Sequence, residues 1–317
     1  MLVLAAAAAG GCRSQGAPAD TPAAPTAPPA AESTTTTVPP LAPPARYRPL
    51  PGEPAPEAKQ AAADVVQALA TFPADAEPVG PARARLAALG VAPAVADGAG
   101  ALLAPGVEAA GDIVYPQLGG LTPTAASVMV VVTQRRREAG RDSSVARTVD
   151  VRLQRSPEGP WAVVALASTG GDPPAAPVPP SEAAAAVLAH PNLELPDSAR
   201  WDVQAGRVDP RLLELIAALA ADRRLAVTVL ATGHPRDVFA TGRVSNHTVG
   251  RAVDVWAVDG QAVVAQRQPD GPVAALARAA LAAGVTELGG PWDLDGPGGR
   301  SFANTVHQDH LHLAFDA

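Results

Sequence analysis

Two proline-rich segments divide this sequence into separate regions. Residues 13–56 contain 13 of the chain's 35 prolines, together with a Ser-Thr run at residues 33–37. A second break, at residues 171–180, contains five prolines. Such segments supply few core side chains and favour extended chain. We therefore expect a disordered tether at residues 13–56 and a linker at 171–180, with folded domains at 57–170 and 181–317.

The composition of the chain excludes some classes of function. The chain of 317 residues is 47% hydrophobic and 17% charged, a balance that supports a sizeable core. Its net charge of -7, from 31 acidic and 24 basic residues, argues against a nucleic-acid partner. Because Cys12 is the only cysteine, no disulfide forms within the chain, and any metal must be held by histidines and carboxylates.

The N-terminus resembles an export signal. An apolar run at residues 1–9 ends in Gly10, Gly11 and Cys12, after which the sequence becomes polar. This pattern is similar to a bacterial lipoprotein signal over residues 1–12, which implies lipidation at Cys12 and a lipid anchor in the membrane. An ordinary secretory signal and an uncleaved apolar tail remain alternatives. The first two interpretations place the protein outside the cytoplasm, either lipid-anchored or secreted.

The region 57–170 is expected to be a small α+β domain. Apolar spacing predicts helices at residues 57–72 and 82–89. Alternation and apolar runs then predict strands at 127–133, 148–153 and 161–166. Helices followed by an antiparallel meander are similar in order to the nuclear-transport-factor-like fold. The region has no histidine, so we interpret it as a spacer or binding module of unknown role.

The region 181–317 holds all six histidines of the chain. Asp209 followed by Pro210 predicts the start of a helix. A strand is expected at residues 226–230, and a second helix at 272–283 that ends at Gly284.

A polar turn and a following strand suggest a metal site. His247 lies in the turn, and Asp254 lies in the strand, where a carboxylate among apolar neighbours needs a partner. Near the C-terminus, His310 and His312 alternate with apolar residues and share one strand face. Two nitrogens and one oxygen suit Zn²⁺, and three protein ligands leave a position open, as in catalytic sites.

Two motifs carry a family resemblance over about residues 190–317. The pattern Ser-x-His-x-x-Gly-x-Ala-x-Asp, with Asp-x-x-His far downstream, resembles the D-alanyl-D-alanine metallopeptidases and their lysostaphin and hedgehog relatives. The resemblance implies zinc bound by His247, Asp254 and His312. It also implies a zinc peptidase domain with a small antiparallel sheet and flanking helices.

The same resemblance assigns further roles. Asp309 would be the general base and Ser245 would contact the substrate. Strand alternation turns Asp309 away from the face that carries the downstream histidines, so His310 or His307 is the alternative base. Arg236 and Arg243 are the candidates for binding the substrate and stabilising the oxyanion.

These inferences together predict an exported zinc metallopeptidase. It would hydrolyse peptidoglycan stem peptides as a carboxypeptidase, dipeptidase or endopeptidase, using water activated by the metal. Two alternatives stay open. One is a non-catalytic zinc-containing lipoprotein that binds or senses the cell wall, and the other is a structural lipoprotein that acts through the middle region.

Overall fold

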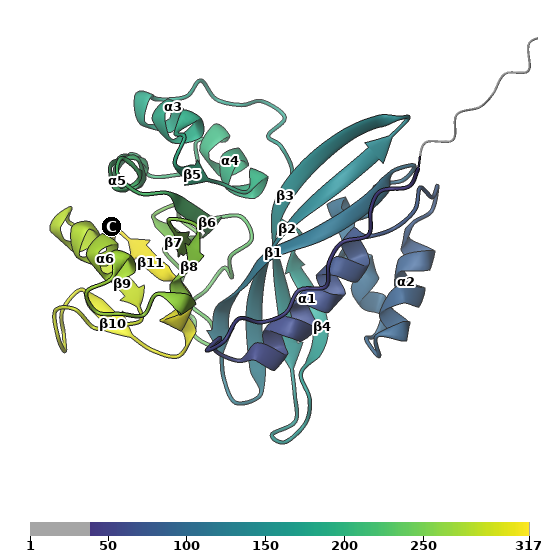
Figure 1. Ribbon diagram of the computed structural model, residues 1–317, viewed down its shortest axis with the longest axis horizontal. Helices are drawn as coiled ribbons and strands as arrows, with labels where there is room; N and C mark the ends of the chain where they lie inside the picture. The colour runs from purple at the N-terminus through teal and green to yellow at the C-terminus, as the bar shows by residue number, and fades with distance from the viewer. Residues whose placement is uncertain (1–38, 317) are drawn as a thin grey trace, which may run out of the picture. The chain divides into compact units, whose positions relative to one another are not determined.

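Two β-sheets with flanking helices make up the part of the chain described by the computed structural model, residues 39–316 (Figure 1). The expected signal with Cys12 and the tether up to residue 38 lie outside this range. The architecture is mixed α+β, as expected. Within residues 39–316, no helix has the length and apolar character needed to cross a bilayer.

The first sheet is an antiparallel meander preceded by helices, which confirms the order expected for this region. Helix α1 packs across all four strands. The elements are α1 (Pro56–Ala70), α2 (Val79–Ala88), the 3-10 turns η1 (Pro93–Gly98) and η2 (Gly100–Leu102), and strands β1 (Glu108–Leu121), β2 (Ala125–Glu138), β3 (Arg141–Gln154) and β4 (Ala162–Ser168), in sheet order β1-β2-β3-β4.

Strand β1 was not predicted from the sequence. It contains Pro116 and several glycines, which are depleted in strands. The pairing of the strand with β2 has two register shifts, one between Ile113 and Tyr115 and another between Leu118 and Gly120. Such bulges re-aim side chains.

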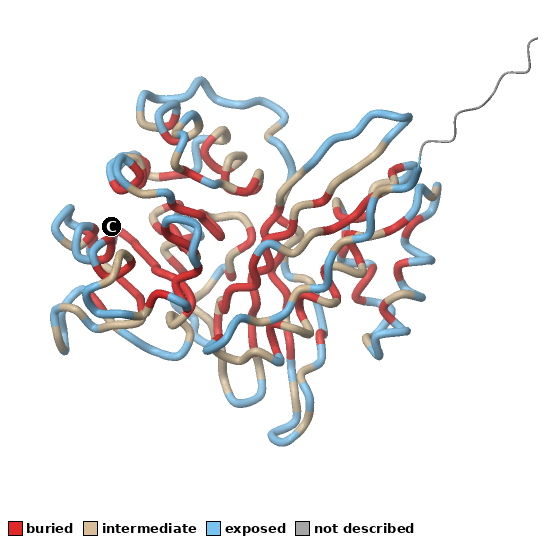
Figure 2. Tube along the Cα trace, viewed as in Figure 1, coloured by how far each residue is buried: buried red, intermediate tan, exposed pale blue. Residues whose placement is uncertain are grey.

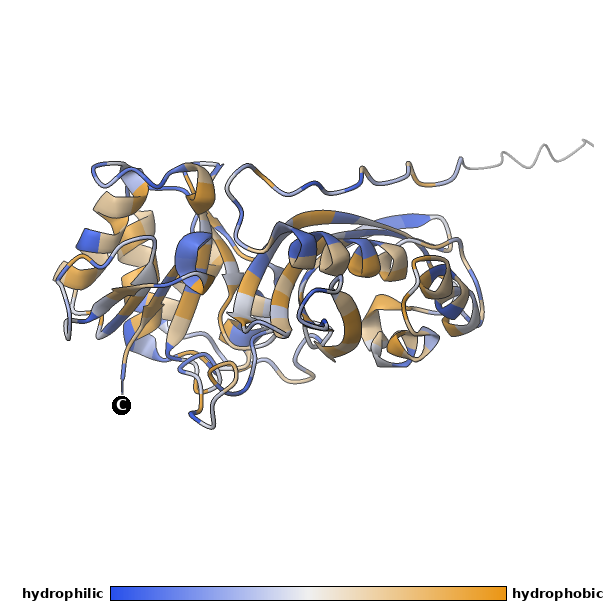
Figure 3. Cartoon of the chain, turned by 90° about the horizontal axis from the view of Figure 1, so that it is seen from below, coloured by the Kyte–Doolittle hydropathy of each residue, from blue (hydrophilic) through white to orange (hydrophobic). Residues whose placement is uncertain are grey.

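The two faces of the first sheet differ in character. One face packs against α1 through apolar residues such as Val149 and Val151. The opposite face carries buried polar residues, among them Gln117, Thr148 and Asp150. Buried segments run along the strands of both sheets (Figure 2), and hydrophobic residues are concentrated on the strands and on the helices packed against them (Figure 3).

The second sheet is mixed, which corrects the expectation of an antiparallel one. Strand β5 is parallel to β6 and β10 is parallel to β9, while the central pairs are antiparallel. Because α4 and α5 intervene between β5 and β6, the chain can return in the same direction. The elements are α3 (Glu182–Ala189), β5 (Leu193–Glu194), α4 (Asp197–Gln204), α5 (Pro210–Ala220), β6 (Leu225–Val229), β7 (Ala252–Val258), β8 (Gln261–Ala262), η3 (Val263–Ala265), α6 (Pro272–Ala282), β9 (Glu287–Gly290), β10 (Ser301–Ala303), η4 (Val306–Gln308) and β11 (Leu311–Ala314).

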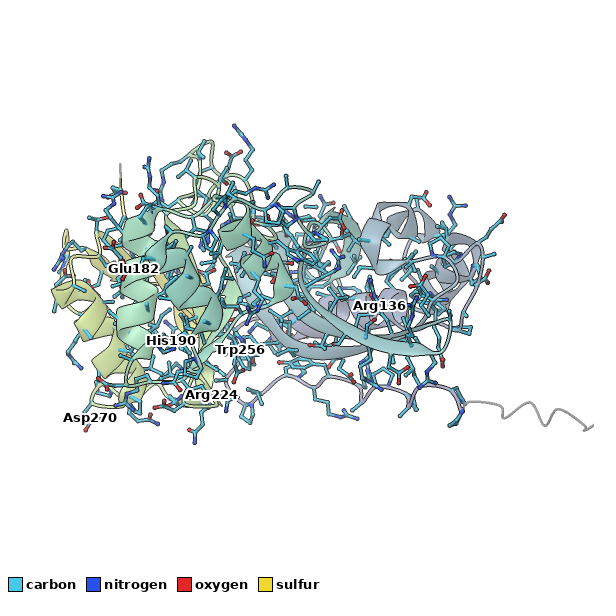
Figure 4. All side chains as sticks on the ribbon, turned by 90° about the horizontal axis from the view of Figure 1, so that it is seen from above. Arg136, Glu182, His190, Arg224, Trp256 and Asp270 are labelled. Carbon is cyan, nitrogen blue, oxygen red and sulfur yellow. The ribbon has the colours of Figure 1, made fainter. Side chains whose placement is uncertain are left out.

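The two sheets contact each other directly. Thr148 Oγ1 on β3 donates a 2.6 Å hydrogen bond to the carbonyl oxygen of Thr228 on β6. The ring of Tyr115 on β1 stacks on Trp256 of β7, with centroids 4.6 Å apart; Trp256 is labelled in Figure 4. Pro39 onward therefore forms one compact unit, and the linker 171–180 contains no helix or strand.

Residues 39–55 differ from the expected disordered tether. They have no helix, but their backbone is hydrogen-bonded to the first sheet and to α1. The amide of Leu41 donates to Glu108 at 2.6 Å, and Gln67 on α1 donates to the Ala45 carbonyl oxygen at 2.8 Å. Hydrogen bonds to its backbone groups therefore hold this proline-rich segment against the folded part of the chain.

Candidate metal centre

A tight turn presents His247. The amide of Thr248 donates to the Ser245 carbonyl oxygen at 3.1 Å, and the amide of Gly250 donates to that of His247 at 3.0 Å. Gly250 has a φ of 73°, and a Cβ there would lie 1.8 Å from the Arg207 carbonyl oxygen. The Gly of the motif is therefore required by both backbone conformation and space.

Three predicted ligand atoms meet at one point. Strands β7 and β11 are paired so that Asp254 and His312 are direct partners. His312 Nδ1 lies 2.9 Å from Asp254 Oδ1, and His247 Nε2 lies 3.1 Å from each of those atoms. All three residues are buried.

The hydrogen bonds of His247 favour a cation at this point. Its Nδ1 lies 2.5 Å from the carbonyl oxygen of Leu230, which only accepts, so Nδ1 carries the ring proton. Nε2 then directs a lone pair at the Asp254 carboxylate, and two lone pairs this close require a cation or a proton between them.

His234 extends the cluster beyond the predicted ligands. His234, His247 and Asp254 can together hold a metal ion, because one ligand atom from each lies within 4.8 Å of the others. The His234 ring stacks on that of His247 with centroids 3.9 Å apart, and its Nδ1 lies 2.7 Å from the Pro235 carbonyl oxygen. Burial lowers the pKa of His234 well below its usual value, so the ring is neutral and able to bind a cation.

Asp309 does not face the candidate metal centre, contrary to the role that the resemblance implied. Its Oδ1 lies 2.6 Å from His310 Nδ1, and its Oδ2 accepts a 3.1 Å hydrogen bond from the Leu118 amide and pairs with Lys59. Strand β11 begins after Asp309, so the alternation of the strand does not apply to this residue. Burial would raise the pKa of Asp309, but Lys59 and His310 lower it, which keeps the carboxylate ionised.

His310 faces the candidate metal centre instead. Its Nε2 lies 3.8 Å from Asp254 Oδ2, and its side chain lines a cavity of about 250 Å³. His307, the other alternative base, also lines this cavity, with its Nδ1 2.8 Å from Asn304 Oδ1. The alternative bases are therefore at the cavity, whereas Asp309 is not.

Of the two predicted arginines, Arg243 lines the cavity and Arg236 does not. Arg243 and Ser245 line it, and Arg243 Nη1 lies 3.5 Å from Glu287 Oε2. Glu287 Oε1 in turn lies 3.7 Å from His312 Nε2. Arg236 pairs with its neighbour Asp237, its side chain is 74% exposed, and it does not line the cavity.

Residues of the first sheet complete the site, and sequence reasoning missed them. Leu118 and Gly119 form part of the cavity wall. Gln117 Nε2 donates a 2.7 Å hydrogen bond to Asp254 Oδ2, while its Oε1 accepts from the Thr228 hydroxyl. Nothing in the local sequence marks Gln117, because its role depends on a contact between distant segments.

No protein-family model, curated protein or solved structure matches this chain significantly. We therefore infer function from the geometry of the cavity and from the motifs that line it.

Proposed function

We propose that this protein is a zinc-dependent peptidase that hydrolyses peptidoglycan stem peptides. The observation that carries the proposal is the triangle of His247 Nε2, Asp254 Oδ1 and His312 Nδ1, with sides of 2.9 to 3.1 Å, beside the cavity. Ligands about 2.0–2.1 Å from a tetrahedral zinc ion lie roughly 3.3–3.4 Å from one another. Only a slight outward movement of these atoms would be needed.

The three ligand atoms, and the groups that are hydrogen-bonded to the ligand side chains, fit a zinc site. Two imidazole nitrogens and a carboxylate oxygen match the ligands of catalytic zinc sites. The Leu230 carbonyl oxygen fixes the His247 tautomer, and Gln117 holds the second oxygen of Asp254. When bound, zinc would acidify water and polarise a carbonyl group.

His310 is the general base in this proposal. The ionised Asp309 carboxylate accepts the Nδ1 proton of His310, which leaves Nε2 unprotonated and directed toward the metal centre. Nε2 can then take a proton from the attacking water and return it to the leaving amine. Asp309 acts through His310 rather than on the substrate.

Ser245 and Arg243 would contact the substrate. Both line the cavity, and the Arg243 side chain is 59% exposed, which leaves its guanidinium free to move toward an anionic group. The substrate class comes from the motif resemblance and from the export signal expected around Cys12. Carboxypeptidase, dipeptidase and endopeptidase activities all remain compatible with the cavity.

Digestion of peptidoglycan tests the proposal. The purified protein would be incubated with peptidoglycan in zinc, with and without a chelator, and the products identified by mass spectrometry. We expect chelator-sensitive release of amino acids or cut cross-links. His247→Ala and His312→Ala should lose stoichiometric zinc, whereas His310→Ala should keep zinc and lose cleavage. A zinc-loaded protein that binds peptidoglycan and cuts nothing would favour the non-catalytic alternative.

A further inference from the structure

We propose that Lys59, on α1, is a positioning residue for the reaction: through Asp309 it fixes the orientation and tautomer of the His310 ring. The inference rests on the proposed function for its effect on catalysis. It assigns a role in the active site to the region 57–170, which we had interpreted as a spacer or binding module.

Lys59 is unusual in both sequence and structure. It is the only lysine of the chain, in which every other basic residue counted is an arginine. Its side chain is 0% exposed, although lysine is almost never fully buried unless it is paired. Such a residue is costly to bury, so the partners of its ammonium group decide what it does.

The Lys59 ammonium group has three partners. It forms ion pairs with the buried carboxylates of Glu53 and Asp309, and its Nζ lies 3.5 Å from the Tyr115 hydroxyl oxygen. An ammonium group has three donors, so all of them are used. Lys59 is thus held at one position between residues 39–55, the first sheet and the segment that carries Asp309.

Asp309 depends on this charge. Its carboxylate is fully buried, and its other donors are the Leu118 amide and the His310 ring. A buried carboxylate without a cation is strongly disfavoured, and it becomes neutral or reorganises. A neutral Asp309 would no longer hold the ring proton on His310 Nδ1, and the tautomer with the proton on Nε2 cannot act as a base.

Substitution of Lys59 separates this role from a general structural one. Lys59→Met removes the charge, and Lys59→Gln keeps a hydrogen-bond donor without charge in case the methionine variant fails to fold. Glu53→Gln is the matched control, because it alters the same buried cluster but leaves the contact between Lys59 and Asp309. Each full-length variant would be assayed for zinc content, for thermal unfolding, and for kcat and KM on peptidoglycan stem peptides.

We expect Lys59→Met and Lys59→Gln to lower kcat about 10- to 100-fold, with little change in KM or zinc content. Glu53→Gln should stay within about threefold of wild type, since the contact to Asp309 remains. The double variant of Lys59→Gln with Asp309→Asn should lose no more than Asp309→Asn alone. Equal losses in the Lys59 and Glu53 variants, or additive losses in the double variant, would overturn the inference.

A second readout does not depend on activity. In zinc-loaded protein labelled with ¹⁵N-histidine, the ring shifts of His310 report which nitrogen carries the proton. We expect Nδ1 protonation in the wild type and in Glu53→Gln, and a shift toward Nε2 protonation in Lys59→Gln. An inactive wild type would refute the peptidase, whereas an unchanged His310 tautomer in Lys59→Gln would refute the role of Lys59.

Discussion

Gln117 Nε2 on β1 lies 2.7 Å from Asp254 Oδ2 on β7, a hydrogen bond between residues 137 positions apart in the sequence. Gln117 comes from the first sheet and Asp254 is a predicted metal ligand of the second. The same first sheet presents the Leu118 amide to Asp309. The orientation of the candidate metal centre is therefore set by both halves of the described chain.

Replacing Gln117 tests this coupling. Gln117→Leu removes the donor to Asp254 Oδ2, so we expect the dissociation constant for zinc to rise about 10- to 100-fold. Isothermal titration with zinc measures the change. Gln134→Leu is the control, since Gln134 is also buried on the first sheet but donates to the carbonyl oxygens of Ala70 and Leu102. Equal weakening of zinc binding in both variants would mean that general destabilisation is responsible.

Metal removal should lower stability. A ligand that binds only the folded state adds about 4 kcal/mol when present at about 1,000 times its Kd. We expect a chelator to lower the Tm of the wild type measured by scanning calorimetry, and to leave the Tm of His312→Ala unchanged. His190→Ala, at the end of α3, should behave like the wild type (Figure 4). A chelator effect that persists in His312→Ala would place the metal elsewhere.

Phe239 covers Gly120 at the edge of the cavity. A Cβ at residue 120 would lie 2.1 Å from Phe239 Cγ, so Gly120→Ala should displace this ring and cost roughly 1–3 kcal/mol in the free energy of unfolding. Because Phe239 lines the cavity, KM should change as well. Gly242→Ala provides a control in open space, with no atom within 4 Å of its Cβ. The free energy of unfolding would be measured by urea denaturation. Equal values for both variants and the wild type would contradict the prediction.

The carboxyl group of Asp295 should have a strongly lowered pKa. The Ser301 hydroxyl and the amides of Arg300 and Ser301 donate to it and lower its pKa to about 2. Because this value is below the ordinary one of about 3.9, the ionised carboxylate stabilises the fold above about pH 4, and this stabilisation disappears as the pH falls to about 2. NMR titration of the Asp295 carboxyl carbon measures the pKa. Ser301→Ala should raise it, and an unchanged pKa in that variant would disprove the cause.

Much of the fold followed from local patterns. The apolar spacing of α1 was visible in the sequence, as were the alternation of β3 and the start of α5, where Asp209 accepts a hydrogen bond from the Arg211 amide at 2.9 Å. Strand β1 was not, because Pro116 and its glycines break the usual strand composition. Its structure depends on pairing with β2 along its length.

Local sequence patterns indicate which side chains of the candidate metal site lie together. The alternation of residues 310–315 predicts that His310 and His312 share one side of their segment, although β11 includes only His312, and the Gly250 turn presents His247 next to Asp254. The partners of Asp309, in contrast, depend on contacts between segments that are distant in the sequence. This residue precedes β11, so no periodicity directs its side chain, and its carboxylate turns to the buried cation of Lys59. Local sequence specifies direction within an element, but a buried charge is oriented by the counter-charge that folding brings to it.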